Sequence, residues 1–360
     1  MEENKREHVR VGWQRNTLED YTVQQARASQ TKNPFMTIQP AFKEIVGFAK
    51  ESDWPGLTLL HEKSYAFAHE AGVYDDATKS VYFTANWQSS RDPLKIHSVH
   101  TETLKLTEQN FDKVINANGA CMLGHAILFC AQGDMEHNGG LVLVVPSTGE
   151  QVVLLDHFHG KPFNSLNDVV IEHPTGCIWF TDPDYAYAQG FRPRPQLPNH
   201  VYRYDLTTQA CSVVEADLKK PNGLCFSHDY KHMYITDTGA IAAHEKPGEV
   251  YYDETGPSTI YKYDVINGTL HNKRTFAYIA NGVPDGIKCD TKGNVYTGCG
   301  DGIQVFEPER GTLIGKILVP GGVANFNFAR GRIWIYNETK LWVADVAARG
   351  CLEQIECSSS

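Results

Sequence analysis

Six polar side chains stand at matching positions in a sequence pattern that recurs along the chain. In each copy an acid or amide, usually followed by Gly, opens a short apolar stretch, and a turn leads to a second stretch that carries Tyr or Trp. The six residues are Glu70, Asn118, Asn167, Asn222, Asp285 and Asn325. Carboxylate and amide oxygens aimed at one point suit Ca²⁺ better than metals that prefer His or Cys. A single Asn-Gly or Asp-Gly pair more often marks a hairpin turn, but six matched copies favour a metal site.

The spacing of the copies indicates how these side chains are positioned. They recur at intervals of roughly 40 to 60 residues, the length of a propeller blade built from a four-stranded sheet. In three copies a Thr stands fourteen residues after the polar residue, at Thr84, Thr181 and Thr236. We therefore predict an all-β fold, a six-bladed β-propeller with a short N-terminal extension. If each polar residue opens the innermost strand of its blade, all six side chains converge at one mouth of the central channel.

Three regions are expected along the chain. Residues 1–33 are charged and polar with little periodicity, which predicts a partly ordered N-terminal tail. Residues 34–350 are assigned to the propeller as one closed domain, because six blades account for most of the chain. Residues 351–360 are expected to form a C-terminal tail.

Other segments are expected to complete the blades. Residues 35–63 contain apolar stretches at 36–38, 42–46 and 57–60, enough for one or two strands. Because a propeller closes by pairing strands from its two ends, this segment is expected to complete the blade that ends at 341–346.

Two further strands and two insertions are expected between the repeats. Residues 96–99 and 103–106 suit outer strands of the first blade. Residues 185–199 are aromatic and rich in Pro, and are expected to arch over one face of the disc, where such loops commonly shape a pocket. Residues 240–255 lengthen the fourth blade.

Composition argues against two classes of partner and favours one cellular compartment. The net charge is −10 and the isoelectric point about 5.8, which argues against nucleic acid or an anionic membrane as a partner. The nine cysteines form no CxxC pair, so we expect buried free thiols and no structural zinc site. Their odd number and the lack of an apolar N-terminal region favour a cytoplasmic location. We expect a monomer or a weak homo-oligomer.

Several motifs resemble those of one known family. They are HEAGVY at 69–74, FNSLNDV at 163–169, WFTDP at 179–183, PNGLCFS at 221–227 and VPDG at 283–286. In this order and spacing they resemble the senescence-marker-protein/gluconolactonase family of six-bladed calcium propellers, and most closely its fungal lactonohydrolase branch. The resemblance covers roughly residues 55–345.

The resemblance implies a calcium site and marks two departures. The family's ligands fall on Glu70, Asn167, Asn222 and Asp285, with Ca²⁺ as the expected cofactor and Mg²⁺, Mn²⁺ or Zn²⁺ as possible replacements. Gly72 stands where the family usually has Pro. Ser165 and Leu166 stand where sugar-lactone members often carry Arg, which weakens the expectation of a sugar lactone.

The expected activity is calcium-dependent hydrolysis of a small-molecule lactone or a similar small cyclic ester. The metal would polarise the carbonyl, and Asp285 would act as general base for the attacking water or attack directly. Glu70 is expected to be purely structural. Asn118 and Asn325 are expected to hydrogen-bond the substrate or a metal-bound water. Tyr185 is expected to contact the substrate as part of an apolar lid.

Further expectations concern two aromatic residues of the lid and the histidine beside Glu70. Tyr187 and Phe191 are expected to join Tyr185 in the lid. His69 is expected to point away from the channel, because successive side chains of a strand alternate between its faces. No Gly-x-Ser-x-Gly motif is present, which disfavours a serine hydrolase.

Two alternatives share these motifs. One is an enzyme that uses the same metal cradle for another reaction on a fungal metabolite, such as isomerisation, ring rearrangement or phosphotriester cleavage. The other is a non-catalytic calcium-binding or protein-interaction propeller. Two carboxylates that repel one another at a channel mouth without a cation argue against the second alternative.

Overall fold

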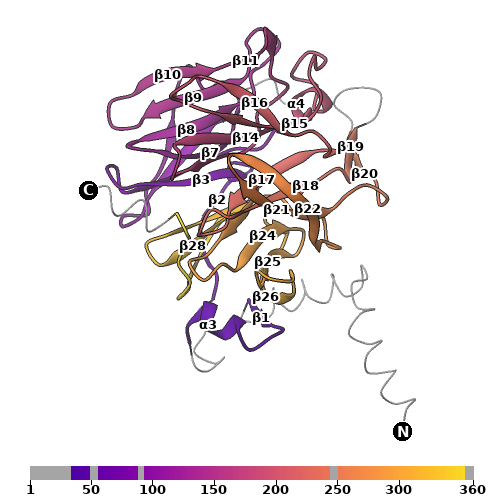
Figure 1. Ribbon diagram of the computed structural model, residues 1–360. Helices are drawn as coiled ribbons and strands as arrows, with labels where there is room; N and C mark the ends of the chain where they lie inside the picture. The colour runs from indigo at the N-terminus through magenta and orange to yellow at the C-terminus, as the bar shows by residue number, and fades with distance from the viewer. Residues whose placement is uncertain (1–33, 49–55, 88–92, 244–249, 353–360) are drawn as a thin grey trace.

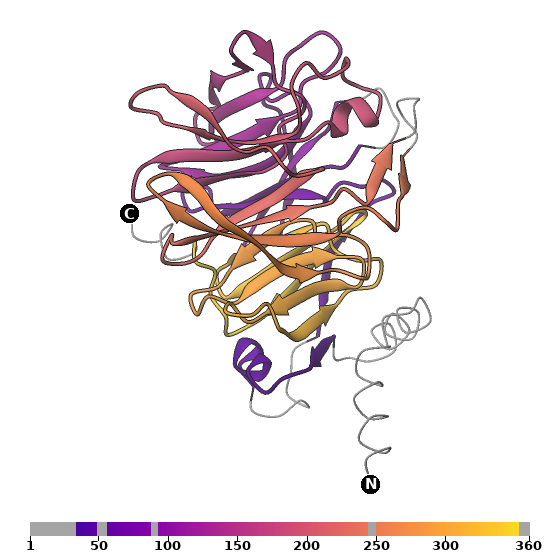
Figure 2. The ribbon, with the colours of Figure 1, turned by 45° about the vertical axis from the view of Figure 1, so that its right-hand side comes forward.

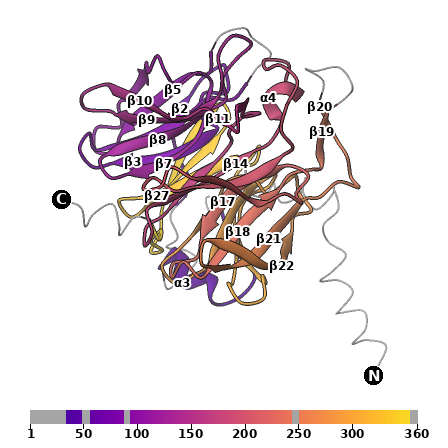
Figure 3. The same cartoon turned by 45° about the horizontal axis from the view of Figure 1, so that its top comes forward.

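Six antiparallel sheets follow one another around a common axis, as Figures 1 and 3 show. The computed structural model describes residues 34–48, 56–87, 93–243 and 250–352. The predicted six-bladed β-propeller is therefore confirmed. The expected tail over residues 1–33 lies outside the described residues, as does the expected C-terminal tail from residue 353 onward.

Counted outward from the channel, the first four strands of blades 1 to 5 follow one another in chain order, whereas the outermost strand of blade 6 comes from the N-terminal segment. Blades 1 to 3 consist of β3 (Glu70–Asp75), β4 (Ser80–Thr84), β5 (Ile96–His100) and β6 (Leu106–Gln109); β7 (Ala117–Leu123), β8 (Ala126–Ala131), β9 (Gly140–Val145) and β10 (Glu150–Leu155); and β13 (Val169–Glu172), β14 (Cys177–Asp182), β15 (His200–Tyr204) and β16 (Cys211–Glu215). A small hairpin of β11 (His157–Phe158) and β12 (Lys161–Pro162) joins blades 2 and 3.

The second half of the ring repeats this arrangement. Blades 4 to 6 consist of β17 (Pro221–Phe226), β18 (His232–Asp237), β21 (Thr259–Ile266) and β22 (Thr269–Tyr278); β23 (Ile287–Cys289), β24 (Val295–Cys299), β25 (Gly302–Phe306) and β26 (Leu313–Leu318); and β27 (Asn325–Ala329), β28 (Arg332–Asn337), β29 (Lys340–Asp345) and β2 (Thr58–Glu62).

The N-terminal segment closes the ring. Strand β2 pairs antiparallel with β29, with Thr58 opposite Val343, so the predicted pairing of the two ends is confirmed. Strand β1 (Phe35–Thr37) adds a fifth strand to blade 5 beside β26 (Figure 1). Residues 42–46, considered as strand from their apolar pattern, form the short helix α3 (Phe42–Val46) instead, because a helical turn buries Phe42, Ile45 and Val46 together.

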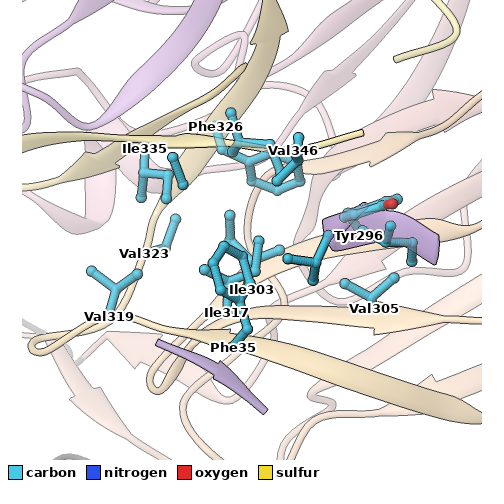
Figure 4. Packing of buried hydrophobic residues seen from close by; sticks show 14 of the residues in the cluster. Phe35, Tyr296, Ile303, Val305, Ile317, Val319, Val323, Phe326, Ile335 and Val346 are labelled. Carbon is cyan, nitrogen blue, oxygen red and sulfur yellow. The ribbon is translucent and has the colours of Figure 1, made fainter. Parts of the chain in front are cut away.

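The hydrophobic core is divided among the six interfaces between neighbouring blades. One cluster of buried side chains fills each interface, including the one between blades 6 and 1. Figure 4 shows the cluster between blades 5 and 6, where Phe35 packs beside Ile303 and Ile317, and Phe326 and Ile335 lie on the opposite side. The closed sequence of interfaces holds the inner strands of all six blades in fixed relative positions.

One predicted strand begins later along the chain than expected. Residues 103–106 were expected to be an outer strand, but Thr103 lies in a turn in which Leu104 has a φ of 57°. Pairing with β5 begins only at Leu106. The apolar alternation of this segment therefore reflects side chains of a turn that pack inward rather than a strand.

The two insertions lie on the same side of the propeller in Figures 1 and 2. The first contains helix α4 (Tyr185–Ala188), and the second contains the hairpin of β19 (Ile241–Ala243) and β20 (Val250–Tyr252). Within the described residues, no helix is long and apolar enough to cross a bilayer.

Candidate metal centre

The inner strands bring the six polar residues to one end of the channel. Glu70 and Asn325 are the first residues of β3 and β27, and Asn118 and Asn222 are the second residues of β7 and β17. The other two, Asn167 and Asp285, stand two residues before β13 and β23. The side chains of all but Asp285 are buried, and Asp285 is half-buried. Because inner strands of a propeller run in the same direction, their first residues meet at one mouth.

The three Thr residues of the repeat tie blades 1, 3 and 4 each to the next blade. The Oγ1 of Thr181 donates to the backbone carbonyl of Asn222 at 2.7 Å, and that of Thr84 donates to the carbonyl of Asn118 at 3.0 Å. Thr236 does the same to Asp285 at 3.2 Å. The spacing of these Thr residues was visible in the sequence, but their role as links between blades was not inferred from it.

The Gly residues after three of the polar residues are not turn residues. Gly119, Gly223 and Gly286 lie at inner strands and none has a positive φ. A Cβ on Gly286 would lie 2.2 Å from Cγ of Asn325, and one on Gly223 would lie 2.6 Å from the carbonyl oxygen of Asp285. Real Cβ atoms do not approach so closely, so Gly at these positions lets the polar residue of the next blade reach the centre.

Two acids and a histidine meet at this mouth. Ligand atoms of His69, Glu70 and Asp285 all lie within 4.8 Å of one another. Burial, the charge of Asp285 and that of Asp168 raise the pKa of Glu70 to about 8, although His69 and a hydrogen bond from Asn325 oppose the shift. Burial also raises the pKa of Asp285. Two carboxylates that resist ionisation side by side form a site that a cation stabilises.

The prediction that His69 points away from the channel was wrong. His69 precedes β3, and the register of that strand shifts between Ala71 and Val73. Ala71 has a φ of 68° and Gly72 a φ of 88°, so the regular alternation of faces does not extend back to His69. Proline cannot adopt the conformation of Gly72, because its ring fixes φ near −65°, which explains why Gly replaces the family's Pro here.

His69 is held by a residue of blade 6 that sequence reasoning missed. Its Nδ1 lies 2.8 Å from Oε1 of Glu338, whose Oε2 accepts a hydrogen bond of 3.1 Å from Asn86. Burial alone lowers the pKa of His69, but Glu338, Glu70 and Asp285 outweigh it and raise that pKa to about 10. A protonated His69 thus compensates part of the negative charge. Glu338 lies in the turn between β28 and β29, where no repeat pattern marks it.

Several buried oxygens at this mouth lack a donor. Among the described residues, Oδ1 of Asn118, Asn167 and Asp285 has no hydrogen-bond partner. An unsatisfied buried polar atom costs about 1 to 3 kcal/mol, so three at one place indicate a missing partner. Oxygen atoms from amides and a carboxylate are the donors that a hard divalent cation takes. The residues present therefore fit such a cation.

Asn325 has a different environment from these amides. Its Nδ2 donates to Oε2 of Glu70 at 2.7 Å, and its Oδ1 accepts from the backbone N–H of Phe326 at 2.8 Å. Both of its polar atoms are therefore used within the protein, and the amide fixes the orientation of the Glu70 carboxylate.

A cavity of about 200 Å³ opens above the centre. Asp285 and Glu338 line it, together with Gly-rich turns of blades 5 and 6. The hydroxyl of Tyr185 in α4 contacts Oγ1 of Thr238, and burial and the charge of Asp285 raise the pKa of Tyr185. Lys220 holds the helix by an ion pair of 2.5 Å between its Nζ and Oδ1 of Asp184.

The other two expected lid residues lie farther along the insertion. Tyr187 is half-buried in α4, and Phe191 stacks on Trp87 with ring centroids 6.4 Å apart. Of the three, Tyr185 is the one that the structure brings to the centre.

Comparison with known proteins agrees with the fold and with these motifs. The family model described as the SMP-30/Gluconolactonase/LRE-like region matches residues 69–245 and 240–344. The chain is 32% identical over 286 residues to the lactonohydrolase oryL of Aspergillus oryzae, covering 74% of this chain and 65% of that protein. It is 28% identical over 187 residues to a gluconolactonase of Zymomonas mobilis, covering 49% of this chain and 48% of that protein.

A solved structure shows the same architecture. The gluconolactonase XC5397 from Xanthomonas campestris superposes with a TM-score of 0.70 at 25% sequence identity, covering 87% of this chain and 95% of that one. Against the two curated relatives, the chain spans about two thirds of one protein and about half of the other.

Proposed function

The chain belongs to the SMP-30/gluconolactonase/LRE-like family, and we propose that it is a hydrolase that opens a lactone or a similar small cyclic ester. The names of its relatives, lactonohydrolase and gluconolactonase, support this reaction class. The observation that carries the proposal is the convergence of the Glu70 and Asp285 carboxylates beside a cavity, together with three buried oxygens that lack a donor among the described residues, one of them on Asp285.

A divalent cation, Ca²⁺, is the proposed cofactor. Glu70, Asn167, Asn222 and Asp285 would hold it, with Mg²⁺, Mn²⁺ or Zn²⁺ as candidate replacements. When bound there, such a cation would polarise the lactone carbonyl and stabilise the negative charge that develops on its oxygen. Glu70 contributes charge and is oriented by Asn325 rather than by the substrate.

Asp285 is the proposed proton acceptor. Its Oδ1 has no donor among the described residues and would be free to accept a proton from water. A water that attacks the lactone carbonyl would transfer its proton to this carboxylate. The bond between the carbonyl carbon and the ring oxygen would then break, and the ring oxygen would take the proton back from Asp285 and leave as the hydroxyl of a hydroxy acid.

The remaining mouth residues would position the substrate. Oδ1 of Asn118 is free to accept a hydrogen bond from a substrate hydroxyl, and the Tyr185 ring supplies an apolar wall. Lys220 lies over that ring, with its Nζ 4.9 Å from the centroid, and fixes its place.

Ser165 and Leu166, which stand where sugar-lactone members of the family often carry Arg, favour a lactone with few hydroxyl groups. Ser165 donates its hydroxyl to the carbonyl of Pro183 at 2.7 Å and accepts from the N–H of Ala186 at 3.1 Å. Leu166 is fully buried in the core between blades 2 and 3. Neither residue is available to bind a polyhydroxylated ring, so we propose an alkyl- or aryl-substituted lactone as the substrate class.

A panel of lactones tests this proposal. Proton release should be followed with aldono-, pantoyl-, alkyl- and aryl-lactones, with calcium and after chelation. We expect chelator-sensitive hydrolysis, fastest for the alkyl or aryl members. If every lactone remains intact while calcium binds, the reaction assignment is wrong and the site serves isomerisation or binding instead.

A further inference from the structure

A second cavity lies at the opposite end of the channel. It has a volume of about 240 Å³ and is lined mainly by residues two to four positions beyond the polar openers on the same inner strands. At about 3.3 Å per residue, this places these residues roughly 7 to 13 Å from the metal centre. Apolar side chains dominate its wall: Val73, Met122, Val170, Phe226, Phe328 and Leu352.

One cation faces this apolar space. Lys288, the central residue of β23, lines the cavity and is half-buried. Within the described residues it forms no hydrogen bond and no ion pair. Ser227 and Asn327 also line the cavity, but their side chains already bond to Asp229 at 2.7 Å and to Tyr336 at 2.5 Å. Lys288 is therefore a lysine of this wall whose ammonium group has no hydrogen-bond or ion-pair partner among the described residues.

One acid, Asp168, interacts electrostatically with Lys288 without an ion pair among the described residues. The Asp168 carboxylate, however, already accepts hydrogen bonds from the backbone N–H groups of Val169 at 2.9 Å and Leu224 at 3.4 Å. An ammonium group among apolar side chains without a hydrogen-bonded counter-charge is costly, and an anionic ligand would reduce that cost.

We propose that this cavity binds a small apolar carboxylate, with its carboxylate at Lys288 and its hydrocarbon or aromatic body against the apolar wall. A single ammonium group suits one carboxylate, whereas a phosphate group usually takes several donors. The cavity holds roughly eight water volumes, so a ligand of about ten non-hydrogen atoms fits. This site is separate from the proposed lactonase centre and does not depend on that function.

Calorimetric titration with octanoate, 1-octanol and octylammonium tests the proposal, because the three share a chain and differ in charge. Octanoate should bind about tenfold tighter than octanol, and octylammonium should not bind, since a hydrogen bond to a charged group is worth about 1.5 to 3 kcal/mol. Lys288→Met should weaken octanoate at least about tenfold and leave octanol unchanged. Lys288→Arg, which keeps the charge, should retain octanoate binding.

Two controls locate the ligand. Lys292→Met removes a charge from the same blade, but Lys292 is exposed and paired with Glu44, so octanoate affinity should not change. Octanoate should slow alkylation of Cys351, which lines the cavity, and not of Cys211, which is equally half-exposed but lies on β16. Equal affinity for octanoate and octanol, wild-type binding by Lys288→Met, or unprotected Cys351 would each overturn the proposal.

Discussion

The hydroxyl of Thr236, on the second strand of blade 4, donates a hydrogen bond of 3.2 Å to the backbone carbonyl of Asp285 in blade 5. The same hydroxyl accepts a hydrogen bond of 2.8 Å from the N–H of Gly223. It therefore connects the start of its own inner strand to the acid of the next blade. The site is consequently held by contacts between blades as well as by the side chains that face the channel.

Replacing this Thr by Val should loosen the site. Thr236→Val keeps the shape and leaves the Gly223 N–H and the Asp285 carbonyl without their partner, at a cost of about 1 to 3 kcal/mol in the free energy of unfolding. Calcium affinity should fall as well. Urea unfolding and calcium titration measure the two effects. Thr103→Val, in an exposed turn, should change neither, and wild-type behaviour of Thr236→Val would refute the link.

Adding a methyl group at Gly286 should displace Asn325 from Glu70. The new Cβ would lie 2.2 Å from Cγ of Asn325, so one strand must move, at about 1 to 3 kcal/mol. Calcium affinity should drop at least about tenfold. Gly176→Ala is the matched control, because Gly176 has a φ of 73° in an open turn. It should lower stability and leave calcium affinity intact; equal affinities in the two variants would contradict the role given to Gly286.

Calcium removal should lower thermal stability. A ligand that binds only the folded state adds about 2.7 kcal/mol when present at 100 times its dissociation constant. Chelation should therefore reduce the melting temperature, and calcium should restore it. Glu70→Gln should largely abolish this response, whereas Glu102→Gln, at an exposed acid, should preserve it. A melting temperature that ignores both chelator and calcium would argue for a metal-free propeller.

A buried ion pair beside the mouth should make stability depend on pH. Asp301 lies 2.7 Å from Nζ of Lys316 and accepts further bonds from Asn281, Gln304 and Cys299. Burial alone raises the pKa of Asp301, but the charge of Lys316 and these hydrogen bonds outweigh it and lower that pKa. The ionised form is thus favoured by folding, so the stabilisation is complete above the unfolded pKa and disappears as pH falls through the folded one.

Asp301→Asn tests that dependence. Breaking one partner of a buried pair costs about 3 to 5 kcal/mol, so the variant should be less stable than the wild-type protein at pH 7. The difference should shrink as the pH falls below the unfolded pKa of about 3.9 and through the lower pKa of Asp301 in the folded protein. Chemical unfolding at several pH values measures it. A constant difference across this range would mean that the charge of Asp301 contributes nothing.

The repeat made much of the molecule predictable. Six polar residues at blade spacing imply six inner strands, and strands that run in one direction must bring their first residues together. Free thiols were also expected, and all eight cysteines in the described part of the chain are free. These features follow from local pattern and from the geometry of a closed ring.

What escaped prediction depends on contacts between distant residues. His69 turns toward the centre because Glu338, 269 residues away, binds its ring, and no local pattern encodes that contact. Asn-Gly pairs are typical of turns, yet the Gly residues here lie at inner strands and allow the polar residue of the next blade to approach closely. Helix α3 forms where packing against blade 5 overrides an ambiguous apolar stretch.

The most direct test is the rate of lactone opening by wild-type protein and Asp285→Asn, each with saturating calcium. A general base contributes about 10² to 10⁴ in rate, so the variant should lose at least a hundredfold in rate while it still folds. Asp345→Asn, at an exposed acid of β29, should keep full activity. Undiminished hydrolysis by Asp285→Asn, or by chelated wild-type protein, would contradict the proposed metal-dependent lactonase.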